Sequence, residues 1–318
     1  MPILRHEETR HRTLRPDHRS QDALHLDRQM PWMSERRLDH YPGRQHQNRD
    51  PRMEPIRQRR MAQTPGGNEM RKLYEKNELT FAIVWIVIYC VLQSLANPLN
   101  EKIGVEYSAS AIFSILQSVI LLVFIRKNNL LKRYGLCKSP ISASRFLFYI
   151  PLIILATRNF WNGAAFNLNL AGTVCYIACM LWVGFLEEVI FRGLLFKAIA
   201  KDNVKTAIII SSVTFGLGHL LNLVNGSGAG IAENLLQVTG AIAIGFLFVI
   251  LYYRGGSLFP CIITHSAINI TSVFANVVGL TIEKRIIFQL VLFAITITYS
   301  FILTKTLPKN QYYDREDN

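Results

Sequence analysis

The chain has 318 residues, of which 50% are hydrophobic and only 18% are charged, and it carries a formal net charge of +13. This composition is typical of a membrane protein and argues against an arrangement of two soluble domains. Outside the N-terminal part the basic residues fall between long apolar runs and form no clustered basic face, which excludes nucleic acid as a partner.

Residues 1–69 differ from the rest of the chain. They contain 14 arginines, no lysine and six of the eight histidines, together with many Pro, Gln and Asp residues. No apolar run there is long enough for a signal peptide or could bury a core, so we expect a disordered tract. Because Met70 opens a short basic lead-in of the kind that precedes a first membrane span, we hypothesise that residues 1–69 are an upstream extension. Residues 70–318 then form the membrane domain.

From Thr80 onward, an apolar stretch of helix-spanning length followed by a short polar loop repeats along the chain. A hydrocarbon core about 30 Å thick requires about 20 residues for each helical span. The stretches are apolar on every face, unlike the alternating strands of a transmembrane β-barrel. The sequence therefore predicts an all-α, multi-pass transmembrane bundle of about eight helices. The stretches are residues 80–96, 108–125, 146–157, 171–196, 206–221, 235–253, 257–278 and 286–304.

Loop charges predict the orientation of the bundle. Positive residues concentrate in the segments 71–76, 126–145 and 197–205, whereas the alternate loops carry few. Positive residues in short loops stay in the cytoplasm, so we expect an integral protein of the plasma membrane with both termini cytoplasmic. Lys284 and Arg285 depart from this pattern at the final hairpin.

Five ionisable residues lie inside the expected spans. Because a charge in hydrocarbon is costly, such residues are usually retained for pairing or for function. A single membrane histidine is more often a helix–helix hydrogen bond than a catalyst, but two histidines with an adjacent pair of glutamates favour a catalytic site. These residues are Glu187, Glu188, Arg192, His219 and His265.

The spacing of these residues suits a buried site. Glu188 and Arg192 are four residues apart on one helical face, where a guanidinium can compensate a carboxylate. Glu187 then points about 100° away from this face, so it is not engaged in the pair with Arg192 and is available for another role. The alternative is a purely structural ion-pair cluster.

Two further patterns contain the histidines. In Phe215-Gly216-Leu217-Gly218-His219, the glycines leave room beside the histidine for a substrate or for a neighbouring helix. His265 and Asn269 again share a helical face. The alternatives are plain helix packing for the glycines and an interhelical amide bond for Asn269.

A glutamate and a histidine that converge in a wet pocket can hold and deprotonate a water molecule. A second histidine with an asparagine amide can stabilise the oxyanion that forms when this water attacks a peptide carbonyl. The same Glu and His side chains could instead hold a zinc ion whose bound water is the nucleophile. The residues leave both mechanisms open.

The ordered set E-E-x-x-x-R, F-x-x-x-H and H-x-x-x-N, spread over residues 171–276, resembles the CAAX protease and bacteriocin-processing family of intramembrane endopeptidases. That family includes the type II CAAX prenyl endopeptidases. It is generally described as metal-dependent, which implies zinc held by Glu187, His219 and His265, although a glutamate-based mechanism has also been proposed for it. The resemblance implies these roles: Glu187 with His219 activates water, Glu188 and Arg192 support that arrangement, and His265 with Asn269 binds the oxyanion.

The resemblance leaves the substrate open. Eukaryotic relatives remove the last three residues of prenylated C-a-a-X proteins, whereas bacterial members are linked to bacteriocin self-immunity, peptide maturation or protein secretion. The expected partners are membrane lipid and a peptide or protein substrate, either prenylated or a bacteriocin precursor. The alternative function is a non-proteolytic membrane immunity protein that binds a peptide toxin or its receptor. A coupled transporter is disfavoured, because no internal repeat or pair of broken helices is present.

Overall fold

The computed structural model describes residues 65–221 and 230–308. Apart from one isolated bridge between Ala164 and Ala275, its regular structure is helical, which confirms the all-α class for this part of the chain. Five helical segments are long and apolar enough to cross a membrane. They are α3 (Glu78–Ile103), α4 (Ser108–Lys127), the continuous run Leu170–Ala200, α10 (Ile231–Gly255) and α12 (Ile282–Thr306).

Three of the eight expected stretches form shorter helices. These are α5 (Ile150–Ala156), α8 (Val204–Gly218) and α11 (Phe259–Thr271), which the short η4 (Ser272–Phe274) extends. The stretch 146–157 is broken because Leu147, Phe148 and Tyr149 all have positive φ, a conformation that a helix cannot contain. Of the about eight predicted spans, five are thus long and apolar enough to cross a membrane, and the other three stretches form shorter helices.

A helix that the sequence did not predict, α2 (Pro65–Lys76), precedes the first long span. It begins inside the tract 1–69, for which we expected disorder, and the rest of that tract, residues 1–64, lies outside the described residues. Asn77 then caps α3, since its side chain accepts a hydrogen bond from the backbone N–H of Thr80.

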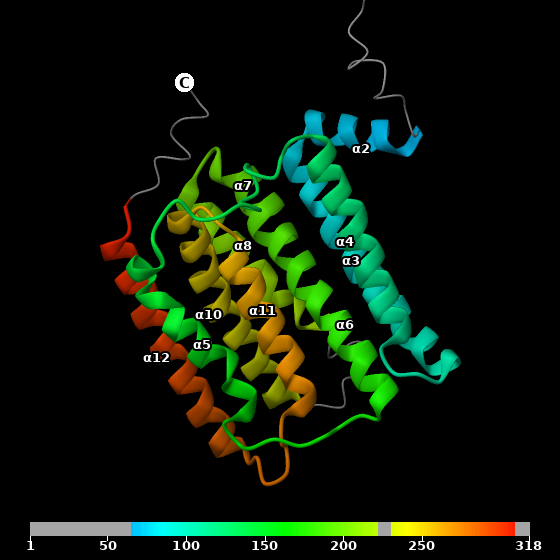
Figure 1. The fold of residues 1–318 in the computed structure, drawn as a ribbon, viewed down its shortest axis with the longest axis vertical. Coiled ribbons are helices and arrows are strands. Elements are labelled where there is room, and N and C mark those ends of the chain that lie inside the picture. The colour runs from blue at the N-terminus through cyan, green and yellow to red at the C-terminus, as the bar shows by residue number, and fades with distance from the viewer. Residues whose placement is uncertain (1–64, 222–229, 309–318) are drawn as a thin grey trace, which may run out of the picture. The chain divides into compact units, whose positions relative to one another are not determined.

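The run Leu170–Ala200 is the central element of the bundle (Figure 1). It consists of α6 (Leu170–Glu187), the π-helix η3 (Glu188–Leu195) and α7 (Phe196–Ala200). On one side α6 packs against α4, which pairs with α3, and on the other it packs against α11. Helix α10 packs between α8 and α12. The run therefore contacts both halves of the bundle.

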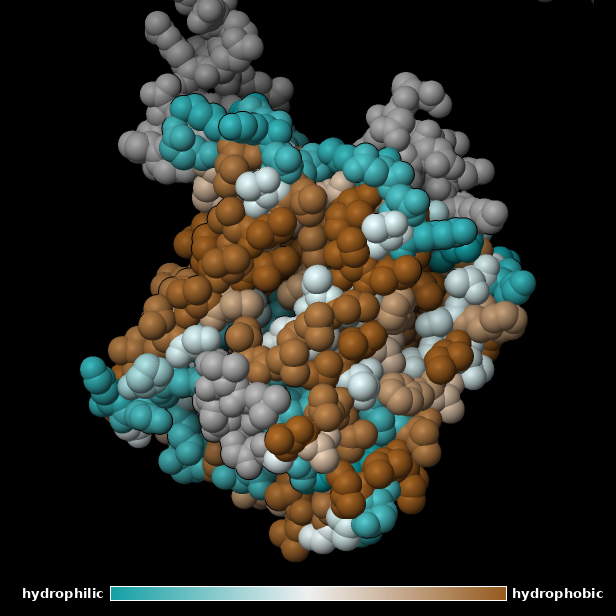
Figure 2. All heavy atoms as spheres, turned by 180° about the vertical axis from the view of Figure 1, so that it is seen from behind, coloured by the Kyte–Doolittle hydropathy of each residue, from teal (hydrophilic) through white to brown (hydrophobic). Residues whose placement is uncertain are grey.

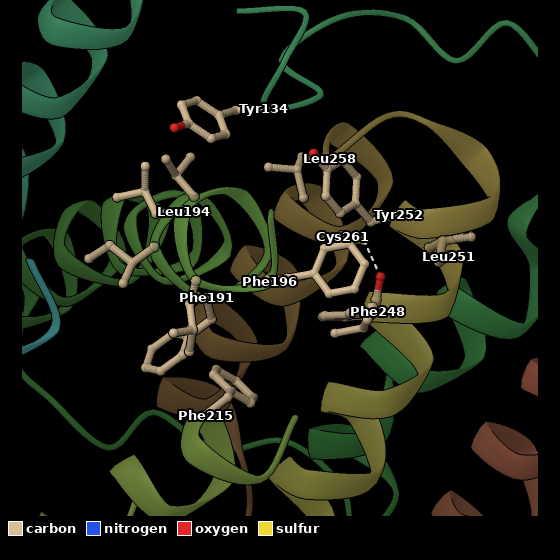
Figure 3. Packing of buried hydrophobic residues seen from close by; sticks show 14 of the residues in the cluster. Tyr134, Phe191, Leu194, Phe196, Phe215, Phe248, Leu251, Tyr252, Leu258 and Cys261 are labelled. Carbon is tan, nitrogen blue, oxygen red and sulfur yellow. Dashed lines mark hydrogen bonds between the residues drawn. The ribbon is translucent and has the colours of Figure 1, made fainter. Parts of the chain in front are cut away.

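All eight residues of η3 are buried in the core. Figure 3 shows buried side chains from η3, α7, α8, α10 and α11 packed together there, with the rings of Phe196 and Tyr252 edge to face at a centroid distance of 6.0 Å. Leu247, Phe248 and Leu258 in this cluster are fully buried. In a bilayer such side chains gain from close van der Waals packing rather than from removal from water, and this packing holds η3 in position.

The positively charged segments lie together at one end of the bundle, where Figure 1 shows α2 and α7. Arg133, in the loop after α4, and Lys201, after α7, both pair with Glu78 at the start of α3, at 2.8 and 3.0 Å. The Tyr134 hydroxyl donates a hydrogen bond to that of Tyr74 on α2. The three basic segments identified in the sequence therefore share one end.

Between its ends the bundle has an apolar exterior, visible as the brown surface across the middle of Figure 2. Exposed aliphatic side chains on α3 and α12, such as Val87, Val91, Ile287 and Leu290, contribute to it. An apolar belt of this kind is what the hydrocarbon of a bilayer solvates. The architecture is that of a multi-pass membrane protein.

Candidate functional site

A buried ionic cluster lies where α6 passes into η3 and meets α11. Glu188 Oε1 accepts a hydrogen bond from Arg192 Nη1 at 3.1 Å and lies 2.8 Å from His265 Nδ1. Glu188 and Arg192 are completely buried, and His265 is 6% exposed. A carboxylate this deep is tolerable only with such partners. The predicted pairing of Glu188 with Arg192 is present.

Arg192 is held by aromatic faces as well as by the carboxylate. Its guanidinium carbon lies 4.0 Å from the ring centroid of Phe215 and 5.7 Å from that of Phe248. The Phe215 ring also meets the rings of His219 and His265 edge-on, with centroids 5.3 and 5.4 Å apart. Phe215, noted in the sequence only as part of a pattern, therefore packs between the cation and both histidines.

Glu187 points away from the Glu188–Arg192 pair, as its helical position predicted. Its Oε2 lies 3.4 Å from His265 Nε2, and its side chain is 13% exposed whereas that of Glu188 is fully buried. Its Oε1 accepts a hydrogen bond from the Tyr89 hydroxyl on α3. Glu187 thus has no arginine partner, since one of its oxygens is held by Tyr89 and the other faces His265.

Tyr89 was missed by the sequence analysis. It is a half-buried tyrosine in an apolar helix, 98 residues before Glu187, and nothing in its local pattern separates it from a tyrosine that only packs. The available signal was that a hydroxyl in the middle of a membrane helix needs a hydrogen-bond partner. The sequence does not show which residue that partner is.

His219 follows α8 directly. Its Nδ1 lies 3.3 Å from the backbone oxygen of Phe215, and its ring interacts electrostatically with Glu187, His265 and Arg158. The structure therefore brings Glu187, His219 and His265 into one neighbourhood, although they come from three different helical segments.

The two glycines before His219 have different surroundings. A Cβ on Gly216 would lie 2.2 Å from Ile242 Cγ1 and 2.9 Å from the backbone nitrogen of Ile242, so this glycine permits close packing against α10. A Cβ on Gly218 would meet none of the described residues within 4 Å. The helix-packing alternative therefore fits Gly216, and the open space beside the histidine fits Gly218.

Asn269 lies one turn after His265 on α11 and is half-buried. Within the described ranges its amide makes no hydrogen bond, so the interhelical amide bond considered as its alternative role is absent there. Asn159 makes such a bond instead. Its Nδ2 donates to the Ile268 oxygen at 2.6 Å and to Thr271 Oγ1 at 2.8 Å, which ties η2 (Arg158–Phe160) to α11.

The side chains as placed do not form a ready metal site. Among the residues that the structure describes, no three His, Cys, Asp or Glu side chains are grouped to hold an ion. Both ring nitrogens of His265 face carboxylates, and one oxygen of Glu187 faces the Tyr89 hydroxyl. The expected zinc ligands Glu187, His219 and His265 are neighbours without being a ligand set.

Comparison with family models gives one match. Residues 169–271 match the family described as type II CAAX prenyl endopeptidase Rce1-like, and this segment is a domain of that family. The match confirms the resemblance inferred from the sequence and implies a protease. It contains Glu187, Glu188, Arg192, His219, His265 and Asn269, but it excludes α3 with Tyr89 and η2 with Arg158. Searches of curated proteins and of solved structures gave no match.

Proposed function

We propose that the chain is an intramembrane endopeptidase in which Glu187 and His219 activate a water molecule for attack on a peptide carbonyl. The observation that carries the proposal is the unequal environment of the two adjacent glutamates. Glu188 is neutralised by Arg192 and fully buried, whereas Glu187 keeps one oxygen toward the histidines. Two carboxylates in contrasting environments are what an enzyme uses to separate a structural from a reactive acid.

Glu187 is the proposed base. The Tyr89 hydroxyl holds Oε1, so that Oε2 faces the space shared with the histidines. A water between Oε2 and His219 transfers a proton to Glu187 as its oxygen attacks the carbonyl carbon. When the C–N bond breaks, Glu187 returns that proton to the leaving nitrogen.

His265 is the proposed oxyanion donor. Its Nδ1 is engaged by Glu188, which fixes the ring, while its Nε2 lies 3.4 Å from Glu187 Oε2. This separation exceeds the about 2.7–2.9 Å of a charge-assisted hydrogen bond, so Nε2 is not committed to Glu187. In its imidazolium form His265 donates Nε2–H to the oxyanion, and the free amide of Asn269 one turn away supplies a second donor.

A zinc-dependent reaction, with Glu187, His219 and His265 as ligands, is the alternative carried over from the sequence. It requires the histidines and Glu187 to regroup, because the described side chains form no ligand set as they stand. A bound zinc ion would supply a water of lowered pKa. Loss of activity on treatment with a chelator, and its recovery with zinc, would favour this alternative.

In the proposed orientation the protein spans the plasma membrane, and the basic end of the bundle, with Arg133 and Lys201, lies in the cytoplasm. Both termini of the chain then lie in the cytoplasm as well. A cysteine introduced at Lys127, at the basic end, should react with an impermeant maleimide only after the membrane is opened. The same change at Lys102, at the opposite end of α3, should react in intact cells. The reverse labelling would contradict the orientation.

The function is tested by incubating purified protein with a farnesylated C-a-a-X peptide, its unprenylated counterpart and a bacteriocin-precursor peptide, and identifying products by mass spectrometry. We expect one new peptide end from at least one substrate. Glu187→Gln should abolish this cleavage. Glu101→Gln, which changes an exposed residue near the end of α3, should not. If correctly inserted protein cleaves none of them but still protects cells against a peptide toxin, the non-proteolytic immunity role replaces this proposal.

A further inference from the structure

Arg158 is a cation without a protein partner. It opens η2, just after α5, and is half-buried. Within residues 65–221 and 230–308 its guanidinium has neither an ion pair nor a hydrogen bond. Five donors on a permanently charged group thus face no acceptor in the described part of the chain.

Three other cations of the bundle have protein partners. Arg192 has Glu188 and the Phe215 face, and Arg133 and Lys201 share Glu78 at the basic end. Uncompensated charge in a largely apolar protein is costly and marks a site that receives its counter-charge from outside.

Arg158 belongs to the neighbourhood of the site. The next residue, Asn159, is fixed to α11 by hydrogen bonds of 2.6 and 2.8 Å to Ile268 and Thr271. These two residues lie on either side of Asn269 along the helix. Thr271 Oγ1 also lies 3.4 Å from the Ala156 oxygen, at the end of α5. The guanidinium is close enough to His219 for the two to interact electrostatically.

We propose that Arg158 binds the C-terminal carboxylate of the peptide substrate, so that cleavage occurs a short, fixed distance from a free chain end. This inference rests on the proposed protease function. A carboxylate is the one anion that every unmodified peptide carries whatever its sequence, and guanidinium pairs with it in a two-bond geometry. Since an extended chain spans about 3.3–3.6 Å per residue, a cation fixed beside the site sets how many residues can follow the scissile bond.

The test compares a peptide that the wild type cleaves with the same peptide amidated at its C-terminus. Amidation should lower kcat/KM about 10- to 100-fold in the wild type, the range for a charge-assisted hydrogen bond. Arg158→Gln should reduce cleavage of the acid to the level of the amide and leave the amide unchanged. Arg158→Lys keeps the charge but loses the two-bond geometry of the guanidinium, so it should retain part of the preference for the acid over the amide. Arg126→Gln, at an exposed residue of the basic end, should retain the whole preference.

Equal cleavage of acid and amide by the wild type would overturn the proposal. So would an Arg158→Gln variant that loses both activities alike, which would indicate that Arg158 supports the fold or binds a lipid headgroup.

Binding separates this inference from the protease proposal. In the Glu187→Gln protein, a fluorescent acid peptide should bind at least about tenfold more tightly than its amide, and the added Arg158→Gln change should remove the difference. This result supports the carboxylate site even if no substrate is cleaved. Equal binding of the two forms, or binding of neither, contradicts it.

Discussion

Replacement of Arg192 by methionine tests the energetics of the buried cluster. Methionine has nearly the length of the arginine side chain but removes its charge, and so leaves the fully buried Glu188 with His265 as its remaining partner. Charges 3.1 Å apart interact by about 5 kcal/mol at an effective dielectric constant of about 20. Part of this only offsets desolvation, and removal of one partner from a buried pair costs about 3–5 kcal/mol.

The lost contact between the guanidinium and the Phe215 face, 4.0 Å away, adds about 1–2 kcal/mol. For a membrane domain of this size we therefore expect Arg192→Met to lower the thermal unfolding midpoint in detergent by roughly 10 °C or more. The double change Glu188→Leu/Arg192→Met should recover most of this loss, because it removes both charges together. It should nevertheless be inactive, since His265 loses the carboxylate that orients it.

Unfolding is followed by the fluorescence of a thiol-reactive dye or by loss of soluble monomer on heating. Arg126→Met, at an exposed position, is the matched control and should shift the midpoint by no more than a degree or two. The reasoning is refuted if Arg192→Met is as stable as that control, or if the double variant is no more stable than Arg192→Met alone.

Two further changes have defined outcomes. Tyr89→Phe removes the hydroxyl that holds Glu187, so kcat should fall about tenfold with KM and the unfolding midpoint nearly unchanged; an unaltered kcat would show that the hydrogen bond does not position the base. Gly184→Val should lower the unfolding midpoint sharply, because even its Cβ would lie 2.3 Å from Ser266 Oγ and 2.8 Å from the Ser266 backbone nitrogen. Gly218→Ala is its stability control, because the added Cβ would meet no described residue within 4 Å. Equal midpoints for the two glycine variants would contradict the packing argument.

The sequence predicted the helices well because apolar runs of span length have few alternatives in a membrane. It could not show that stretch 146–157 is broken, since the positive φ values at Leu147, Phe148 and Tyr149 depend on tertiary packing. Helix α8 (Val204–Gly218) differs little from the predicted stretch 206–221, since it begins two residues earlier and ends three residues earlier.

The local part of the candidate site was also predictable. Spacing alone gave the Glu188–Arg192 pair and the divergent direction of Glu187, because both follow from helical geometry. The contacts of Tyr89 and the placement of Arg158 were not predictable, since they join segments far apart in the sequence.

The most direct test of the account is cleavage of a farnesylated C-a-a-X peptide by purified protein in detergent, with and without a metal chelator. Wild type is compared with Glu187→Ala, His219→Ala and the exposed control Glu101→Ala. We expect the first two changes to reduce the rate by about 10²–10⁴-fold, the contribution of a positioned acid or base, while the control cleaves normally. Cleavage that Glu187→Ala leaves unchanged would contradict the proposed site.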